Sequence, residues 1–215
     1  MIYLVFLVTN RLEVKEMVMK LLLLAVFLLS NQAIQADEMT HSRLIIDDFT
    51  DSYGRSTLGG YWQLSSDRVM GGVSNGRAVL VPSEDDENRF VLKMTGEVRL
   101  ENNGGFVQVR LPLSVQNRQF DATEYNGISL RVRGNGQKYY VHLRTAASRL
   151  PWLYHYSGFE APEEWTDIKI PFDSFISDTA FLGDLPRDRL VSIAVVAAKQ
   201  RMAADIEVAE ISMYK

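Results

Sequence analysis

Two short segments that each contain adjacent glycines most constrain what this chain can fold into. The first runs from Ser66 to Ser74 and reads SDRVMGGVS, and the second runs from Leu100 to Phe106 and reads LENNGGF. Glycine pairs allow positive φ angles and let another stretch of backbone, or a ligand, approach closely. Because charged and amide side chains flank both pairs, these segments predict structured loops rather than flexible linkers.

The N-terminal residues 1–36 have the pattern of an extension followed by a secretory signal peptide. A short basic start at Met19-Lys20 precedes an apolar run over 21–29 and a polar stretch that ends at Ala36, where we expect cleavage. The alternative is a membrane anchor, but a membrane-spanning helix needs about 20 apolar residues and this run is shorter. We therefore expect a periplasmic or secreted protein with no stable membrane insertion after signal cleavage.

The remaining residues, 37–215, are numerous enough for a single domain with its own core. The chain contains no cysteine, which excludes a disulfide, a thiol nucleophile and a cysteine-based zinc site. Its formal net charge is −4. Nucleic acids and anionic membranes attract clustered positive charge, so this mildly acidic balance argues against both as partners.

Short stretches of alternating apolar and polar residues dominate 37–215. We expect strands at 90–95, 106–111, 128–133, 139–144, 165–170, 190–197 and 206–213, the last with a bulge near Ala209. Glycine, proline and asparagine turns separate these stretches, and helical periodicity is scarce. The pattern predicts an all-β chain that folds as an antiparallel β-sandwich.

Patterns that would indicate catalysis or metal binding are weak. The chain has three histidines, His41, His142 and His155. None accompanies a serine-nucleophile motif, and no zinc-ligand spacing or phosphate-binding glycine loop is present. We expect no catalytic residues, no metal site and no cofactor, and we leave open a structural calcium at Asp47, Asp48 or Asp51.

Polar side chains on two neighbouring predicted strands give the best indication of a binding site. The Gly-Asn-Gly turn at 134–136 predicts that 128–133 and 139–144 form a hairpin. One face of this hairpin would then carry the binding candidates Arg131, Arg133, Tyr140, His142 and Arg144. Three arginines on one face either meet acidic residues of this chain or recognise a carboxylate, a sugar or a partner loop.

An aromatic cluster after Pro151 adds two further binding candidates, Trp152 and Tyr154. Aromatic rings stack on sugar faces and anchor protein interfaces. The alternative is that alternate residues of this cluster belong to a strand with one face in the core.

We assign the two glycine segments a structural role rather than direct ligand contact. Asp67 is expected to accept hydrogen bonds from loop amides, and Arg68 to hold the two segments together through carbonyls or Glu101. The structural set is Trp62, Asp67, Arg68, Gly71, Gly72, Glu101, Asn102, Gly104 and Gly105.

The two glycine segments, followed by YNGISLRVRG at 125–134 and the stretch from Trp165 to Phe172, resemble the complex I intermediate-associated protein 30 family over about 45–213. The resemblance implies a galactose-binding-like jelly-roll sandwich. Mitochondrial members of that family are assembly factors that hold intermediates of respiratory NADH:ubiquinone oxidoreductase. This chain differs from them in carrying a secretory leader rather than a transit peptide.

The resemblance implies a non-catalytic binding protein that holds a protein partner during assembly or maturation, as a chaperone does. The alternative is a carbohydrate-binding module of the cell envelope, and a glycan hydrolase is a weaker third possibility. The expected partner is therefore a protein or an envelope glycan.

Overall fold

The computed structural model describes residues 19–20, 22–24, 43–113 and 118–215. The chain divides into two units, Met1–Ser42 and Arg43–Lys215. The described residues of the first unit are helical. Among the residues described, no helix combines the length and the hydropathy that a membrane crossing requires. Most of the predicted signal peptide, including the expected cleavage site, lies outside the described residues, so it stays a prediction.

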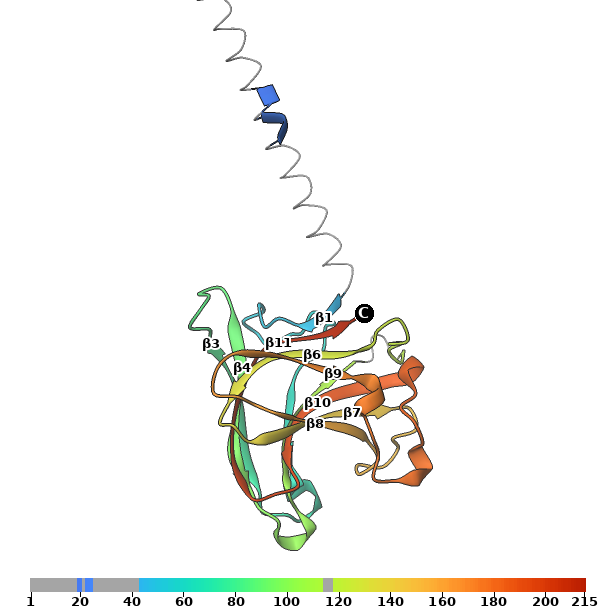
Figure 1. The fold of residues 1–215 in the computed structure, drawn as a ribbon. Coiled ribbons are helices and arrows are strands. Elements are labelled where there is room, and N and C mark those ends of the chain that lie inside the picture. The colour runs from blue at the N-terminus through green and yellow to red at the C-terminus, as the bar shows by residue number, and fades with distance from the viewer. Residues whose placement is uncertain (1–18, 21, 25–42, 114–117) are drawn as a thin grey trace, which may run out of the picture. The chain divides into compact units, whose positions relative to one another are not determined.

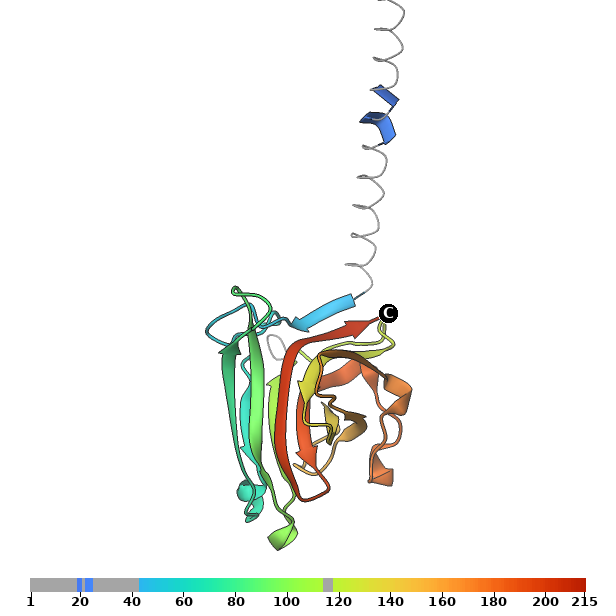
Figure 2. The same ribbon diagram turned by 60° about the vertical axis from the view of Figure 1, so that its left-hand side comes forward.

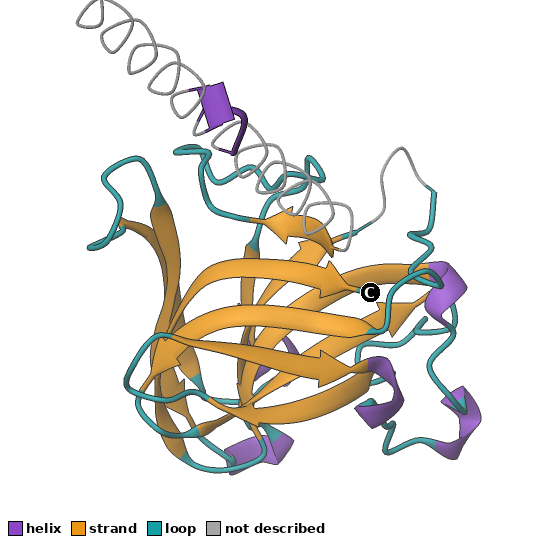
Figure 3. Cartoon of the chain, turned by 45° about the horizontal axis from the view of Figure 1, so that its top comes forward, coloured by secondary structure: helices purple, strands orange, loops and turns teal. Residues whose placement is uncertain are grey.

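Strands dominate the second unit, which confirms the all-β prediction (Figure 3). They are β1 (Arg43–Asp47), β2 (Gln63–Ser66), β3 (Asn75–Pro82), β4 (Phe90–Val98), β5 (Phe106–Pro112), β6 (Gly127–Gly134), β7 (Lys138–Thr145), β8 (His155–Glu160), β9 (Thr166–Pro171), β10 (Leu190–Ala198) and β11 (Met202–Tyr214). Short 3₁₀ helices interrupt them at η1 (Asp67–Met70), η2 (Glu101–Asn103), η3 (Phe172–Ser174), η4 (Ala180–Leu182) and η5 (Arg187–Arg189).

The strands form two antiparallel sheets that face each other as a sandwich (Figures 1 and 2). The six-stranded sheet has the order β3-β4-β11-β6-β9, with β1 also paired to β11, and the five-stranded sheet has the order β2-β5-β10-β7-β8. The predicted bulge in the last strand is confirmed, because the register of β11 against β6 shifts between Val208 and Glu210.

The alternating sequence pattern fills the space between the sheets. The inward side chains of β6 and β7 are fully buried in one apolar cluster: Ile128, Leu130, Val132, Tyr139, Val141 and Leu143. Burying an aliphatic side chain of this size contributes roughly 1.5–3 kcal/mol relative to leaving it in water. This cluster therefore determines which face of each strand points inward, and hence which side chains reach the two outer faces.

The predicted hairpin between 128–133 and 139–144 is wrong. The strand β6 pairs with β11 and β9 in one sheet, whereas β7 pairs with β10 and β8 in the other. The turn at 134–136 is a crossing between sheets, in which Asn135 donates from Nδ2 to the carbonyl of Ala203 and accepts from the Tyr139 hydroxyl. The two strands thus contribute apolar faces to the core from different sheets, so their polar faces belong to opposite outer surfaces.

The central strand of the five-stranded sheet explains a depression on that sheet's outer face. Large residues of β10 point inward, while its outward side chains are no larger than valine: Ser192, Ala194, Val196 and Ala198. The neighbouring strands β5 and β7 carry longer outward side chains on both sides of these small residues. The sequence of β10 therefore forms the floor of a cleft.

Candidate functional site

The buried carboxylate of Asp67 joins the two glycine segments at one end of the sandwich, where η1 and η2 lie side by side (Figures 1 and 2). Within the first segment it accepts hydrogen bonds from the Ser74 amide (2.9 Å) and hydroxyl (2.5 Å). From the second segment it accepts hydrogen bonds from the backbone amides of Gly105 (2.6 Å) and Phe106 (3.4 Å). The prediction that Asp67 satisfies loop amides is confirmed.

Both glycine pairs are needed because this carboxylate lies against them. A Cβ atom on Gly72 would lie 2.3 Å from Cγ of Asp67, and a Cβ on Gly104 would lie 2.4 Å from its Oδ2. Gly71 has a φ of 89°, which lets the chain turn directly after η1. A side chain at Gly72 or Gly104 would push Asp67 away from the amides that donate hydrogen bonds to it.

Hydrogen bonding controls the ionisation of Asp67. Burial alone raises the pKa of this carboxyl, but the bonds from Ser74, Gly105 and Phe106 outweigh it and hold the pKa below its ordinary value. The group is therefore ionised at neutral pH although water does not reach it.

The expected role of Arg68 is wrong. Arg68 is exposed, and Glu101 instead pairs with Arg99 (2.8 Å) and Arg201 (3.1 Å). Hydrogen bonding to Arg99 lowers the pKa of Glu101 to about 2. The second link between the segments comes from Asn102, whose Nδ2 donates to the Gly71 carbonyl at 3.2 Å.

Trp62 makes its contacts within the protein. Its Nε1 donates to Oδ2 of Asp47 at 2.7 Å, and its ring stacks on Phe49 with the centroids 6.1 Å apart. The other oxygen of Asp47 accepts the Phe49 amide, and burial raises the pKa of this carboxyl. Both oxygens of Asp47, the first of the three calcium candidates, are thus used within the protein.

The other calcium candidates are also engaged locally. Asp48 accepts from the amide and hydroxyl of Thr50, and Asp51 accepts from the amide of Tyr53. Over 43–113 and 118–215, no three His, Cys, Asp or Glu side chains are grouped closely enough to hold a metal ion.

The candidate site is a cleft of about 370 Å³ on the outer face of the five-stranded sheet, here called the β10 cleft. Its floor is formed by Ser192 and Ala194 of β10, with Gln108 and Arg110 of β5 on one side and His142 and Arg144 of β7 on the other. One wall comes from the two glycine segments and the other from the β7–β8 loop. The site thus lies at the junction of a rigid sheet and three loops.

Arg144 holds the wall formed by the β7–β8 loop. Its guanidinium donates to the carbonyls of Ser148, Leu150 (3.0 Å) and Pro151 (3.2 Å). These bonds fix the backbone that carries Trp152. Arg144 is therefore part of the cleft and also positions its aromatic wall.

This anchoring gives a prediction. Replacing Arg144 with glutamine removes the guanidinium that donates hydrogen bonds to three loop carbonyls. The β7–β8 loop should therefore open more often. Trypsin should then cut after Arg149, an exposed residue of this loop, several times faster than in the parent protein. The measurement is limited proteolysis followed by mass spectrometry.

The matched control is Arg110→Gln, which removes a cation from the same cleft but no bond to the loop. Equal cleavage rates in the two variants would contradict the anchoring role of Arg144.

His142 and Tyr154 form a stacked pair at the edge of the floor. Their ring centroids are 4.0 Å apart and their planes differ by 12°. Burial lowers the pKa of His142 to about 3, with a smaller effect of the same sign from Lys199, so the ring is neutral at pH 7. Its Nε2 is buried and has no hydrogen-bond partner among the described residues. Tyr140 lies beside this pair on the same face, 6.4 Å from the His142 ring.

Lys199 lines one end of the cleft and is already paired. Its ammonium lies 3.1 Å from Oδ2 of Asp178 and 3.5 Å from the ring centroid of Tyr156. The Tyr156 hydroxyl donates to the same carboxylate at 2.5 Å. At this end of the cleft, the polar groups of Lys199, Asp178 and Tyr156 therefore bind one another.

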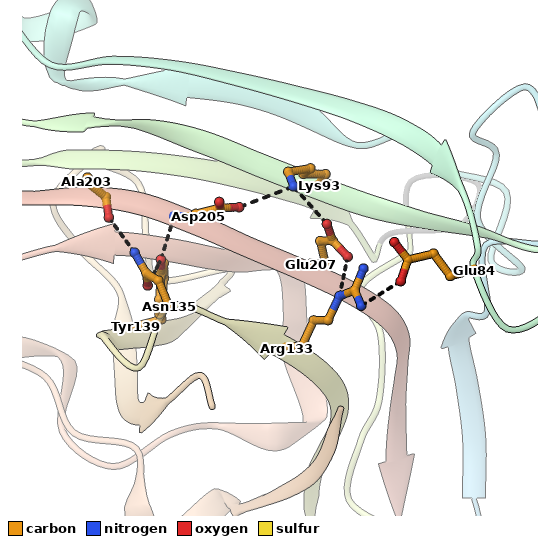
Figure 4. A network of polar contacts seen from close by, with 8 residues as sticks. All are labelled: Glu84, Lys93, Arg133, Asn135, Tyr139, Ala203, Asp205 and Glu207. Atoms are coloured by element: carbon orange, nitrogen blue, oxygen red, sulfur yellow. Dashed lines mark hydrogen bonds and ion pairs between the residues drawn. The ribbon is translucent and has the colours of Figure 1, made fainter. Parts of the chain in front are cut away.

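Three of the predicted binding residues do not line the cleft: Tyr140 lies beside His142, and Arg131 and Arg133 lie elsewhere. Arg131 and Arg133 lie on the outer face of the six-stranded sheet, where both guanidiniums lie over the Trp165 ring. Arg133 bridges Glu207 (2.7 Å) and Glu84 (2.9 Å) in the network shown in Figure 4. The prediction that these arginines share a face with Tyr140, His142 and Arg144 is wrong, because β6 and β7 belong to different sheets.

Sequence reasoning missed several residues of the cleft. Gln108 and Arg110 were recognisable as the polar side of an alternating strand, but the pattern did not show which strand lies beside them. The small residues at Ser192 and Ala194 were the available signal for the floor. Met70 and Leu100, which were grouped with structural loops, also line the cleft.

Comparisons with known proteins agree with this architecture. A family model described as complex I intermediate-associated protein 30 matches residues 48–196. A search of curated proteins finds no match.

The solved structures similar to this one include two carbohydrate-binding modules of Clostridium thermocellum. The family 11 module of the cellulosomal cellulase Lic26A-Cel5E has a TM-score of 0.61 and 15% identity, covering 80% of this chain and 94% of the module. The family 30 module of the cellulosomal cellulase Cel9D-Cel44B has a TM-score of 0.57 and 12% identity, covering 80% and 98%. At these identities the likeness is one of fold, and it supports the predicted galactose-binding-like β-sandwich.

Proposed function

The chain belongs to the complex I intermediate-associated protein 30 family, and from this premise we propose that it is a non-catalytic binding protein that holds a protein partner in the β10 cleft during assembly or maturation. The cleft provides a preformed floor, walls from separate loops and a mixture of apolar and hydrogen-bonding side chains. These are the properties of a recognition site on a rigid scaffold.

The observation that carries this proposal is the apolar rim of the cleft. Val69, Met70 and Leu100 stand exposed on one wall, and Leu150 and Trp152 stand exposed beside the other. Val69 is 74% exposed and Trp152 is 59% exposed. Large apolar side chains gathered around one depression mark a site that another molecule covers, and methionine and tryptophan are enriched where that molecule is a protein.

Binding without turnover fits the chemistry of the cleft better than hydrolysis does. Glycoside hydrolysis uses two carboxylates that face each other across the substrate. Within the described part of the chain, the side chains that line the cleft include no carboxylate, and its histidine is neutral and buried. We accordingly assign no catalytic residue.

A carbohydrate ligand is the second candidate. It is favoured by the exposed ring of Trp152 beside a floor of hydrogen-bonding groups such as Gln108 and Ser192. One similar structure is a family 11 module in complex with a β-1,3-1,4-mixed-linked tetrasaccharide, with a TM-score of 0.61 and 16% identity over 80% of this chain and 95% of the module. The aliphatic rim is the reason to prefer a protein, because Val69, Met70 and Leu100 offer a sugar few hydrogen bonds.

We further propose that the protein acts outside the cytoplasm, in the periplasm or after secretion, because of the leader pattern over 19–36. Mass spectrometry of the purified protein from its host should then give an N-terminus just after Ala36. An N-terminus at Met1 or Met19 would contradict export by this route.

Photo-crosslinking tests the proposed function. A photoreactive phenylalanine analogue at Leu150, on the rim, should form an adduct with one defined protein in the native host. The same analogue at Arg77, exposed on β3 of the other sheet, should give none. Adding Trp152→Ala to the Leu150 probe should abolish the adduct. Adducts of equal yield from both positions, or a rim adduct that survives Trp152→Ala, would contradict the proposed function.

A further inference from the structure

Two arginines face the floor of the β10 cleft from opposite sides. Arg110 of β5 is paired in register with Ala194 of β10, and Arg144 of β7 is paired with Ser192 of the same strand. Strands separated by one neighbour lie about 10 Å apart, and the side chains between these two are small. Both guanidiniums therefore border one open space.

No carboxylate of the described residues neutralises either charge. Arg110 donates to Oε1 of Gln63 at 3.0 Å, and the acceptors of Arg144 among the described residues are all backbone carbonyls. Over the described residues neither arginine has an ion-pair partner, whereas Arg133 on the opposite face has two. The other cation of the cleft, Lys199, is paired with Asp178.

The two positive charges also affect each other. Burial lowers the pKa of Arg144, and the charge of Arg110 lowers it further. Keeping two like charges close together in a partly buried cleft is unfavourable unless an anion comes between them. The guanidinium of Arg110 has further N–H donors for such an anion, because within the described part of the chain its side chain donates one hydrogen bond, to Gln63.

We propose that the β10 cleft binds an acidic segment of the protein partner, with a carboxylate between Arg110 and Arg144 and apolar side chains against the rim. This inference rests on the proposed function and specifies the chemistry of the partner. Arginine recognises a carboxylate through two parallel N–H···O bonds, which supplies direction as well as charge. The exposed side chains of Met70, Leu100 and Trp152 select apolar neighbours around that acid.

The rim decides between a peptide and an anionic glycan. A uronic acid would satisfy the arginines, but it would leave Val69, Met70 and Leu100 facing hydroxyl groups. A peptide with an acidic residue between apolar residues satisfies both parts of the cleft. The observations therefore favour a protein segment.

A display selection with random seven-residue peptides tests the inference. Selection against the parent protein should enrich peptides that carry Asp or Glu next to an aromatic or aliphatic residue. Changing that acid to its amide should weaken binding of the best peptide at least tenfold. Arg110→Glu and Arg110→Gln should weaken it as much, with unchanged thermal unfolding, and Arg77→Glu on the other sheet should leave binding unchanged.

Other results would overturn the inference in distinguishable ways. If the enriched peptides lack acids yet lose binding in Trp152→Ala, the acidic partner is wrong while the proposed binding function stands. If no peptide is enriched, the proposed function fails with it. If no peptide is enriched but oligogalacturonate binds in an Arg110-dependent manner, the ligand is an anionic glycan and the protein segment is wrong.

Discussion

Asp67→Asn should lower the free energy of unfolding by about 3 kcal/mol, the largest stability effect that we expect from a single isosteric change in this protein. The amide nitrogen of asparagine would replace one of the oxygens that accept hydrogen bonds from Ser74, Gly105 and Phe106. Two hydrogen-bond donors would then face each other in a buried site. Urea or thermal unfolding followed by circular dichroism measures the change.

The matched control is Asp85→Asn, the same chemical change in the exposed loop between β3 and β4. It should alter the unfolding free energy by less than about 0.5 kcal/mol. Similar losses in the two variants would contradict the role given to Asp67.

The contribution of Asp67 should also depend on pH. Its pKa is lower in the folded protein than the ordinary value of 3.8. A depressed folded-state pKa contributes stability that is fully present above the unfolded-state value and is lost as pH falls through the folded-state pKa. The difference between the parent protein and Asp67→Asn should therefore be constant from pH 7 to about pH 5 and shrink below pH 3.8. A difference that grows on acidification would contradict this assignment.

Trp152→Ala should weaken ligand binding by about 30-fold, equivalent to about 2 kcal/mol, while leaving stability almost unchanged. The ring is 59% exposed at the rim of the cleft, so removing it leaves no core cavity. Calorimetric titration with the best peptide from the display selection measures the effect. The physical reason is that a large aromatic surface covered by the ligand is lost.

Trp165→Ala is the control for this prediction. Trp165 lies beneath Arg131 and Arg133 on the opposite outer face, so the same truncation there should not change the affinity. Equal losses of affinity in the two variants would mean that the ligand does not occupy the β10 cleft.

The contrast between Asp67 and Arg68 shows what could be read from the sequence. An aspartate at the start of a tight loop has few ways to satisfy its carboxylate other than nearby amides, so its role followed from local chemistry. Arg68 has a long side chain whose partner depends on the whole fold, and the acid expected to meet it pairs with Arg99 and Arg201 instead.

The strands themselves were predictable, but their neighbours were not. Alternation of apolar and polar residues over 128–133 and 139–144 indicates two strands that each bury one face. The same pattern arises whether the strands pair in one sheet or face each other across a sandwich. Turn residues at 134–136 favoured the hairpin, whereas the hydrogen bonds of Asn135 to Ala203 and Tyr139 stabilise the crossing.

The cleft was only half predictable for the same reason. His142 and Arg144 were identified on the polar face of an alternating strand, and Trp152 and Tyr154 in an aromatic cluster of the sequence. The opposite side of the cleft comes from β5, whose Arg110 is brought opposite Arg144 by pairing through β10. That pairing joins segments about eighty residues apart in the chain, and no local pattern encodes it.

Nuclear magnetic resonance mapping of the peptide-binding surface tests the central claim most directly. The selected peptide is titrated into the ¹⁵N-labelled protein, and the amide shifts are assigned to the two sheets. We predict that the largest changes fall on β5, β7, β10 and the β7–β8 loop. Changes concentrated on β3, β4, β6 and β9 would contradict the claim that the outer face of the five-stranded sheet is the binding surface.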